Sequence, residues 1–152
     1  QAHADIQKLF VTQMASINFP VPFAELSAKK EFSNLDGGAW EEDGFCVRAM
    51  RVRHPSFTVG HRIDYDGVSL VYIPDNELAG EHYDVEKGWR KRLVDFLGDV
   101  DVLIHDAMFT DDEYGSKLDW GHSTFGQAVE LAHEAGAKKV LFFHHDPCRS
   151  DQ

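Results

Sequence analysis

Two short apolar runs, each followed at once by histidine and aspartate, constrain the fold of this chain most strongly. Val102-Leu103-Ile104 leads into His105-Asp106, and Val140-Leu141-Phe142-Phe143 leads into His144-His145-Asp146. Apolar runs without alternation predict buried strands. Polar side chains that directly follow such strands lie at the rim of a sheet, where reactive groups are commonly placed. The sequence therefore predicts an α/β layer with a candidate site along one edge.

The rest of the pattern predicts an antiparallel meander followed by helices that cover a sheet. Thr124-Phe125-Gly126-Gln127 has capping-box spacing, and the helix that it opens is expected to turn Phe125, Ala128, Val129 and Ala132 inward. Helices are expected within 1–16, from a cap at Asp84 to Gly98, and from Thr124 to Gly136. Strands are expected at 30–35, 45–52, 59–65, 68–73, 102–104 and 140–143. A turn is expected at Asp36-Gly37-Gly38.

Composition narrows the classes of function. The 152 residues, 43% of them hydrophobic, can bury one core, so we expect a single domain over 1–152. A net charge of −11, spread along the chain, argues against electrostatic binding of nucleic acid or an anionic membrane. It still allows a small phosphorylated substrate held by metal ions. Cys46 and Cys148 form no disulfide framework, which predicts a cytoplasmic protein, and no apolar run approaches the ~20 residues of a membrane span.

Three predicted strands end in a side chain that can bind a metal ion, namely His54, Asp75 and His144. Taken singly, each histidine is more often an ordinary surface or core residue, and Asp75 can equally cap its loop. Imidazole and carboxylate together suit zinc, manganese or iron, and a bridging carboxylate suits a two-metal centre. His144 and His145 are adjacent on an extended chain and point opposite ways, so at most one of them faces a given site. The pattern alone leaves a metal site open.

Five segments stand in an order that is specific when they are taken together. They are His54-Pro55-Ser56-Phe57-Thr58-Val59-Gly60-His61-Arg62, Val71-Tyr72-Ile73-Pro74-Asp75, Leu103 to Phe109, Gly121-His122-Ser123-Thr124 and Leu141 to Pro147. The chain from about residue 31 onward resembles the metallo-β-lactamase fold, in the branch that contains ribonuclease Z and related phosphodiesterase-like hydrolases. The resemblance implies an α/β fold that is half of an αββα sandwich: one mixed β layer with covering helices.

Carried over position by position, the resemblance implies a role for each residue of the candidate site. His54 would bind one metal ion, His144 the other, and Asp75 would bridge both and fix the attacking hydroxide. His122 would protonate the leaving group, and Asp106 would orient that imidazole. Two divalent ions are implied, zinc first and manganese or iron as alternatives. The implied substrate is a phosphodiester, such as a cyclic nucleotide, or a similar small ester.

The departures from the family define what this chain lacks. The family's His-x-His-x-Asp-His metal motif lies upstream of these landmarks and does not occur here; His3-Ala4-Asp5 is a superficial echo and receives no role. We therefore expect the C-terminal half of an enzyme that is inactive by itself, and that forms a homo-oligomer or pairs with the missing N-terminal half. The alternative is a non-catalytic half-domain that serves in binding, sensing or assembly. His105 is expected to point into the structure, away from Asp106.

Overall fold

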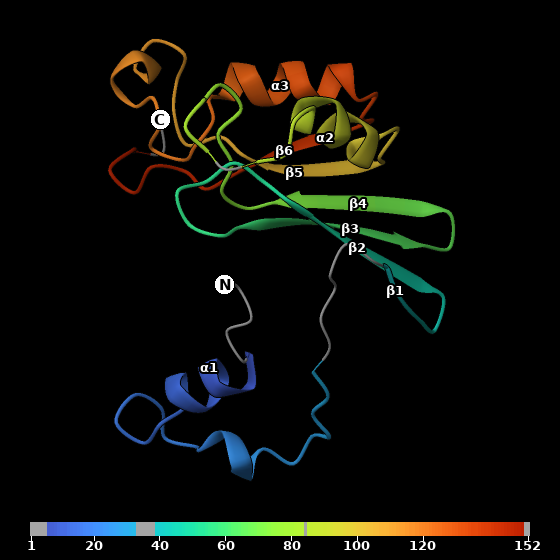
Figure 1. Cartoon of the computed structure of the whole chain (residues 1–152), viewed down its shortest axis with the longest axis vertical. Coiled ribbons are helices and arrows are strands. Elements are labelled where there is room, and N and C mark those ends of the chain that lie inside the picture. The colour runs from blue at the N-terminus through green and yellow to red at the C-terminus, as the bar shows by residue number, and fades with distance from the viewer. Residues whose placement is uncertain (1–5, 33–38, 84, 151–152) are drawn as a thin grey trace. The chain divides into compact units, whose positions relative to one another are not determined.

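Six strands form one mixed sheet in the computed structural model, and they follow the chain order from β1 to β6 (Figure 1). The structure describes residues 6–32, 39–83 and 85–150. Residues 1–34 and 35–152 make two compact units, and the single domain expected over 1–152 stays a prediction. The strands are β1 (Ala39–Glu42), β2 (Phe45–Arg51), β3 (Val59–Tyr65), β4 (Val68–Ile73), β5 (Val102–Asp106) and β6 (Val140–Phe143).

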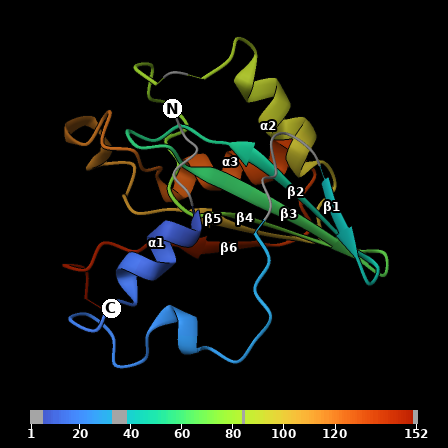
Figure 2. The same cartoon turned by 60° about the horizontal axis from the view of Figure 1, so that its bottom comes forward.

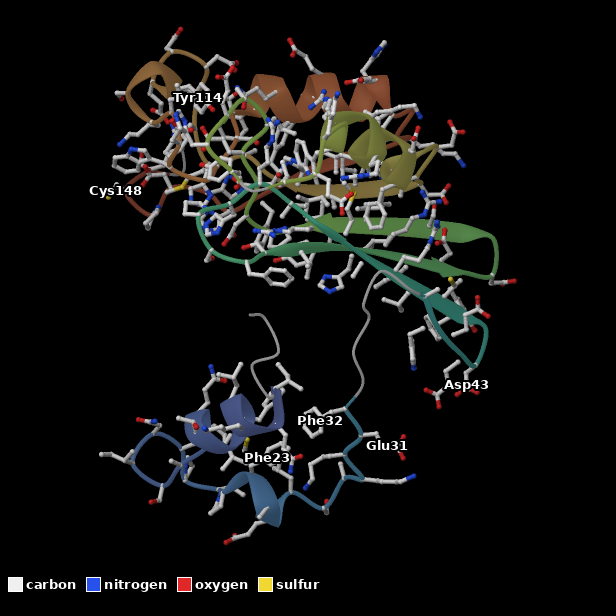
Figure 3. The ribbon with its side chains drawn as sticks, viewed as in Figure 1. Phe23, Glu31, Phe32, Asp43, Tyr114 and Cys148 are labelled. Atoms are coloured by element: carbon white, nitrogen blue, oxygen red, sulfur yellow. The ribbon has the colours of Figure 1, made fainter. Side chains whose placement is uncertain are left out.

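The first unit contains α1 (Ile6–Gln13) and the short helix η1 (Phe23–Glu25). The helix expected within 1–16 is confirmed over 6–13, but none of its residues is buried. Three aromatic rings of this unit gather, with centroid distances of 5.8 to 6.1 Å among Phe10, Phe23 and Phe32; Figure 3 labels the last two. In the described part of this unit, 6–32, the three rings form an aromatic cluster and no residue is fully buried.

Strand direction in the second unit explains where the candidate site lies. Strands β1 to β4 pair antiparallel, which confirms the meander expected over β2 to β4, and β4, β5 and β6 pair parallel, which makes the sheet mixed as expected (Figure 2). Strand β2 runs in the same direction as β4, because two antiparallel steps separate them. The carboxyl ends of β2, β4, β5 and β6 therefore share one edge of the sheet, and polar residues that follow these strands meet there.

Helices α2 (Trp89–Leu97) and α3 (Phe125–Glu134) lie together on one side of the sheet (Figure 1). Their apolar sides close one core with alternate residues of β4 and β5; its fully buried members include Val71, Ile73, Leu93, Leu97, Leu103 and Leu131. The opposite face of the sheet carries large apolar side chains that stay exposed, including Tyr65, Val68, Leu141 and Phe143. The expected oligomer, or pairing with a missing half, stays a prediction.

Several local expectations were wrong or fall outside the described residues. Lys30 to Phe32 forms no strand, while 33–38, including the expected turn, and His3-Ala4-Asp5 lie outside the described residues. Helix α2 begins at Trp89, because Gly88 takes a left-handed conformation before it; Asp84 is not described. In α3 the capping box of Thr124 and Gln127 is confirmed.

The inward face of α3 differs from the prediction at one position. Val129 is 47% exposed, whereas Ala128, Leu131 and Ala132 are buried. These three follow the spacing of one helical face, and Val129 lies one residue beyond it. Among the described residues, no helix is both long and apolar enough to cross a membrane.

Candidate metal centre

The carboxyl edge of the sheet brings together the five residues of the predicted site, His54, Asp75, Asp106, His122 and His144. Asp75 follows β4, and His144 follows β6 with its Nε2 3.6 Å from Oδ1 of Asp75. His54 follows β2, and its Nε2 lies 3.9 Å from Oδ2 of the same carboxylate. One ligand atom each of Asp75, His122 and His144 lies within 4.8 Å of the others. The tight group therefore contains His122, which the sequence assigned to proton transfer, while His54 stands slightly farther out.

Asp106, the last residue of β5, orients His122 through a hydrogen bond to its ring. Nδ1 of His122 donates to Oδ2 of Asp106 at 2.8 Å, and Asp106 is fully buried. The same carboxylate accepts the N–H of Asn76 at 3.0 Å and that of Met108 at 3.1 Å. A carboxylate held by backbone donors cannot rotate away from its imidazole. His122 is therefore oriented with Nε2 left for a substrate or a metal ion.

The electrostatic surroundings of His122 favour its protonated form. Burial acts to lower the pKa of this imidazole, but the hydrogen bond from its ring to Asp106 and the charges of Asp106, Asp75 and Glu77 act the other way. Together they raise the pKa of His122 above its ordinary value. A raised pKa favours the protonated imidazole that a proton donor needs.

His54 has polar neighbours on the side of the ring away from the cluster. Hydroxyl oxygens of Ser56 and Thr58 lie 2.8 and 3.1 Å from its Nδ1. The backbone N–H of Ser56 also donates to Nδ1, at 3.2 Å. In the neutral ring Nδ1 therefore accepts, and Nε2, on the side of Asp75, carries the hydrogen. The turn at Pro55 places these donors within reach, and together they fix the orientation of the ring.

His144 is held in a costly conformation. Its φ of 60° is left-handed, where a non-glycine residue is uncommon. Its Nδ1 is buried and has no hydrogen-bond partner within the described part of the chain. Its ring stacks on that of His122, with centroids 4.5 Å apart. Strain and an unsatisfied nitrogen of this kind collect at functional sites. With one carboxylate and three imidazoles, the donor set fits a divalent transition-metal ion.

Two buried polar residues beside Asp75 were not singled out from the sequence. Asn76 and Glu77 are both fully buried. The side-chain oxygen of Asn76 accepts the N–H of Arg53, the second residue after β2, and its carbonyl accepts the hydroxyl of Ser123 at 2.6 Å. The sequence gives no signal of their burial, because polar residues after a strand usually face solvent.

His105 is fully buried and points away from the cluster, as the sequence predicted. Its Nδ1 lies 2.6 Å from the carbonyl of Asp106 and donates to it, and the side-chain amide of Asn76 donates to Nε2 at 3.2 Å. Burial lowers the pKa of this imidazole, although the contacts with Asp106 act to raise it. A neutral ring satisfies both contacts. His145, to which the resemblance assigned no role, is exposed and lies against the ring of Phe125.

The fold and these side chains define an α/β protein with a histidine–aspartate cluster of metal-binding chemistry at the carboxyl edge of its sheet. The family model described as "Beta-lactamase superfamily domain" matches residues 3–145. The chain belongs to this superfamily, and its sheet and helices are those of the metallo-β-lactamase fold.

Relatives with known names agree with this assignment. A ribonuclease Z of Exiguobacterium sibiricum is 25% identical, over 84% of this chain and 52% of its own length. Solved structures with the same fold include human tRNase Z, short form (TM-score 0.59, 24% identity, 71% of this chain, 38% of that one). YhfI of Bacillus subtilis has the same fold, with a TM-score of 0.62 and 23% identity over 84% of this chain and 48% of that one. Zn(2+)-bound PqqB of Methylobacterium extorquens has it too, with a TM-score of 0.51 and 21% identity over 72% of this chain and 42% of that one. The chain spans about half the length of the curated relatives it matches.

Proposed function

We propose that this chain supplies one wall of the active site of a metal-dependent phosphodiester hydrolase. The observation that carries the proposal is the convergence of Asp75, His122 and His144, whose ligand atoms lie within 4.8 Å of one another. The buried Asp106 stands behind His122 at 2.8 Å. Ion pairs that serve stability alone rarely need two stacked imidazoles against one carboxylate, with a third imidazole within 4 Å.

Asp75, His54 and His144 are the residues that would hold metal ions, and zinc suits them best. Imidazole and carboxylate oxygen are both common zinc ligands, and a relative in fold, PqqB, is Zn(2+)-bound. When bound, such ions lower the pKa of water from about 15.7 towards ~7 and neutralise charge on a phosphate. The carboxylate of Asp75 stands between the nitrogens of His54 and His144. This position suits a bridge between two ions.

The chain's own contribution to the reaction is a general acid, His122. His122 holds a proton at Nδ1 towards Asp106, and with a second proton at Nε2 the ring is a cation that can protonate the departing oxygen. Such general acid catalysis is worth about 10²–10⁴ in rate. The rings of Phe109 and His144 pack against His122 and limit its movement, with centroid distances of 6.0 and 4.5 Å.

The charge of the chain favours a small phosphodiester, such as a cyclic nucleotide, over RNA. A net charge of −11 repels a polyanion, whereas a small substrate is held through the metal ions. The name ribonuclease Z describes an RNA substrate for the relatives, so RNA is the second candidate. The chain spans about half the length of those relatives, so the choice between the two substrates is left to the experiment.

The test uses the longest gene product that contains these residues, with the 152-residue chain beside it. Metal content is measured on the purified protein, and hydrolysis of bis(4-nitrophenyl) phosphate, cyclic nucleotides and a short RNA is assayed with added zinc. We expect metal-dependent hydrolysis of the small diesters by the longer protein and little turnover by the short chain. A longer protein that binds zinc at no site and cleaves none of these substrates contradicts the proposal and supports the alternative of a non-catalytic module.

A further inference from the structure

Glu77 lies at the centre of a buried hydrogen-bond network next to the candidate site. Its carboxylate is fully buried and accepts four donors. Two are the hydroxyls of Tyr83 and Tyr114, the latter in the loop between β5 and α3 (Figure 3). The other two are the backbone N–H groups of Asp119, at 2.7 Å, and Gly121, at 2.8 Å. Burying a carboxylate is costly unless hydrogen-bond donors replace the water that it loses. The four donors therefore allow Glu77 to be buried at this position.

The two tyrosines remain donors at neutral pH. Burial raises the pKa of each phenol, and the hydrogen bond and charge of Glu77 raise it further. Both hydroxyls therefore keep their protons and hold the carboxylate in one orientation. That orientation directs its oxygens at the backbone of the segment that ends in His122.

Both chain neighbours of His122 are bound to the short segment that carries Glu77. Gly121, before His122, donates to Glu77. Ser123, after it, donates to the carbonyl of Asn76 and accepts the N–H of Leu78 at 3.2 Å. The N–H of Asn76 in turn donates to the same Asp106 oxygen that binds His122. The backbone that carries the imidazole is thus fixed on both sides, and Glu77 provides the fixation on the Gly121 side.

We propose that Glu77 is a positioning residue for His122, which acts by holding the N–H groups of Asp119 and Gly121. The expected effect on catalysis rests on the proposed function, in which His122 delivers a proton. The role of Glu77 in holding the loop does not depend on that function. Removing the carboxylate while keeping the side-chain volume should release the loop and weaken proton delivery, with metal binding unchanged. A displacement of about 1 Å can cost up to about 100-fold in rate.

The test compares Glu77→Gln with Asp101→Asn in the longest gene product that contains the chain, loaded with zinc. Asp101 is a matched control, because its carboxylate also accepts a backbone N–H and a hydroxyl, both from Ser69, at the other end of β5. Two substrates are used: bis(4-nitrophenyl) phosphate, whose leaving group departs without a proton, and diphenyl phosphate, whose leaving group gains from protonation. We expect Glu77→Gln to lower kcat for diphenyl phosphate by about 10- to 100-fold and much less for the nitrophenyl ester, with KM and zinc content unchanged.

A second readout does not depend on activity. Amide hydrogen exchange of the peptide around Asp119 and Gly121 should speed up by roughly 10-fold or more in Glu77→Gln, because charge-assisted hydrogen bonds are lost. Asp101→Asn should leave it unchanged. If the unaltered protein hydrolyses neither ester, the proposed function fails, and the exchange still decides whether Glu77 holds the loop.

Two results overturn the positioning role. One is an equal loss of kcat for both esters, which indicates general damage to the structure. The other is unchanged exchange around Gly121 in Glu77→Gln. If that variant does not fold, Tyr114→Phe serves in its place, since it removes one donor that orients the carboxylate; the same selective loss is expected, but smaller. Equal losses for both esters, or no change in either readout, in the folded Tyr114→Phe protein also contradict the proposal.

Discussion

The buried carboxylate of Asp106 accepts Nδ1–H of His122 at 2.8 Å and is itself held by two backbone N–H groups. This pair joins the end of β5 to the segment just before α3, and it determines which ring nitrogen is available. A metal-binding histidine often has the same kind of carboxylate partner. The pair alone therefore does not distinguish a proton donor from a ligand.

Replacing His122 with alanine distinguishes the two roles. If His122 donates a proton, His122→Ala should lower kcat by about 10²–10⁴ while zinc content stays near that of the unaltered protein. Kinetics and elemental analysis on the same preparation measure both. A parallel loss of zinc would assign His122 to the metal ions, as its place in the tight group of ligand atoms also allows.

Asp75 should be needed for both metal binding and turnover. It lies within 4 Å of His54 and His144, so its removal deprives both imidazoles of their shared partner. We expect Asp75→Ala to lose zinc and activity together, and elemental analysis with the phosphodiester assay checks this. Glu113→Ala is a control at an exposed ion pair with Arg149, a carboxylate outside the group of candidate ligands. Zinc retained in full by Asp75→Ala would show that the bridging role is wrong.

Local signals in the sequence located the elements, whereas contacts distant along the chain built the site. The capping box at Thr124 and the unalternating run at Val140 act within a few residues, and the helix cap and the strand were both confirmed. The expected burial of the run was wrong, because β6 stands at the end of the strand order and its residues are exposed or half-buried. The start of α2 depended on the left-handed conformation of Gly88, which short-range apolar spacing does not reveal. Strand β1 was missed because most of its residues are exposed and its pairing with β2 determines it.

The role of Glu77 was hidden for the same physical reason. Its backbone donors, Asp119 and Gly121, lie 42 and 44 residues farther along the chain. A single sequence shows only a charged residue after a strand, which usually faces solvent. The candidate ligands His54, Asp75 and His144 were visible because each comes within three residues of the end of a predicted strand. The residues that hold them in place were not, because their partners come from other loops.

Gly121 should tolerate no side chain, because it packs against His54. A Cβ at this position would lie 2.5 Å from Cδ2 of His54 and 2.7 Å from Cδ of Pro55, and the φ of 97° already disfavours alanine. We expect Gly121→Ala to displace His54 and weaken zinc binding. Gly67→Ala is the matched control, with a φ of 75° and no atom near its Cβ. It should cost only the conformational term, roughly 1–2 kcal/mol. Zinc titration and thermal unfolding of both variants measure the difference.

His105 should make the folded chain less stable as the pH falls below the ordinary pKa of histidine. Burial lowers the pKa of this imidazole in the folded state, so the unfolded chain binds a proton more readily. Stability is therefore fully present above about pH 6.5 and falls as the pH drops below it, by at most about 1.4 kcal/mol per pH unit for one proton. Urea unfolding of the metal-free chain between pH 7 and 5 measures this slope.

The contribution of His105 is separated from that of the other histidines by two variants. His105→Gln should remove the part of the slope between pH 7 and 5 that His105 contributes, although it lowers stability at pH 7 because the ring's contacts with Asp106 and Asn76 are changed. His133→Gln alters an exposed histidine in the last turn of α3 and should keep the slope of the unaltered chain. If the free energy of unfolding of His105→Gln depends on pH as in the unaltered chain, the proton taken up on unfolding binds to another group, and the prediction for His105 is wrong.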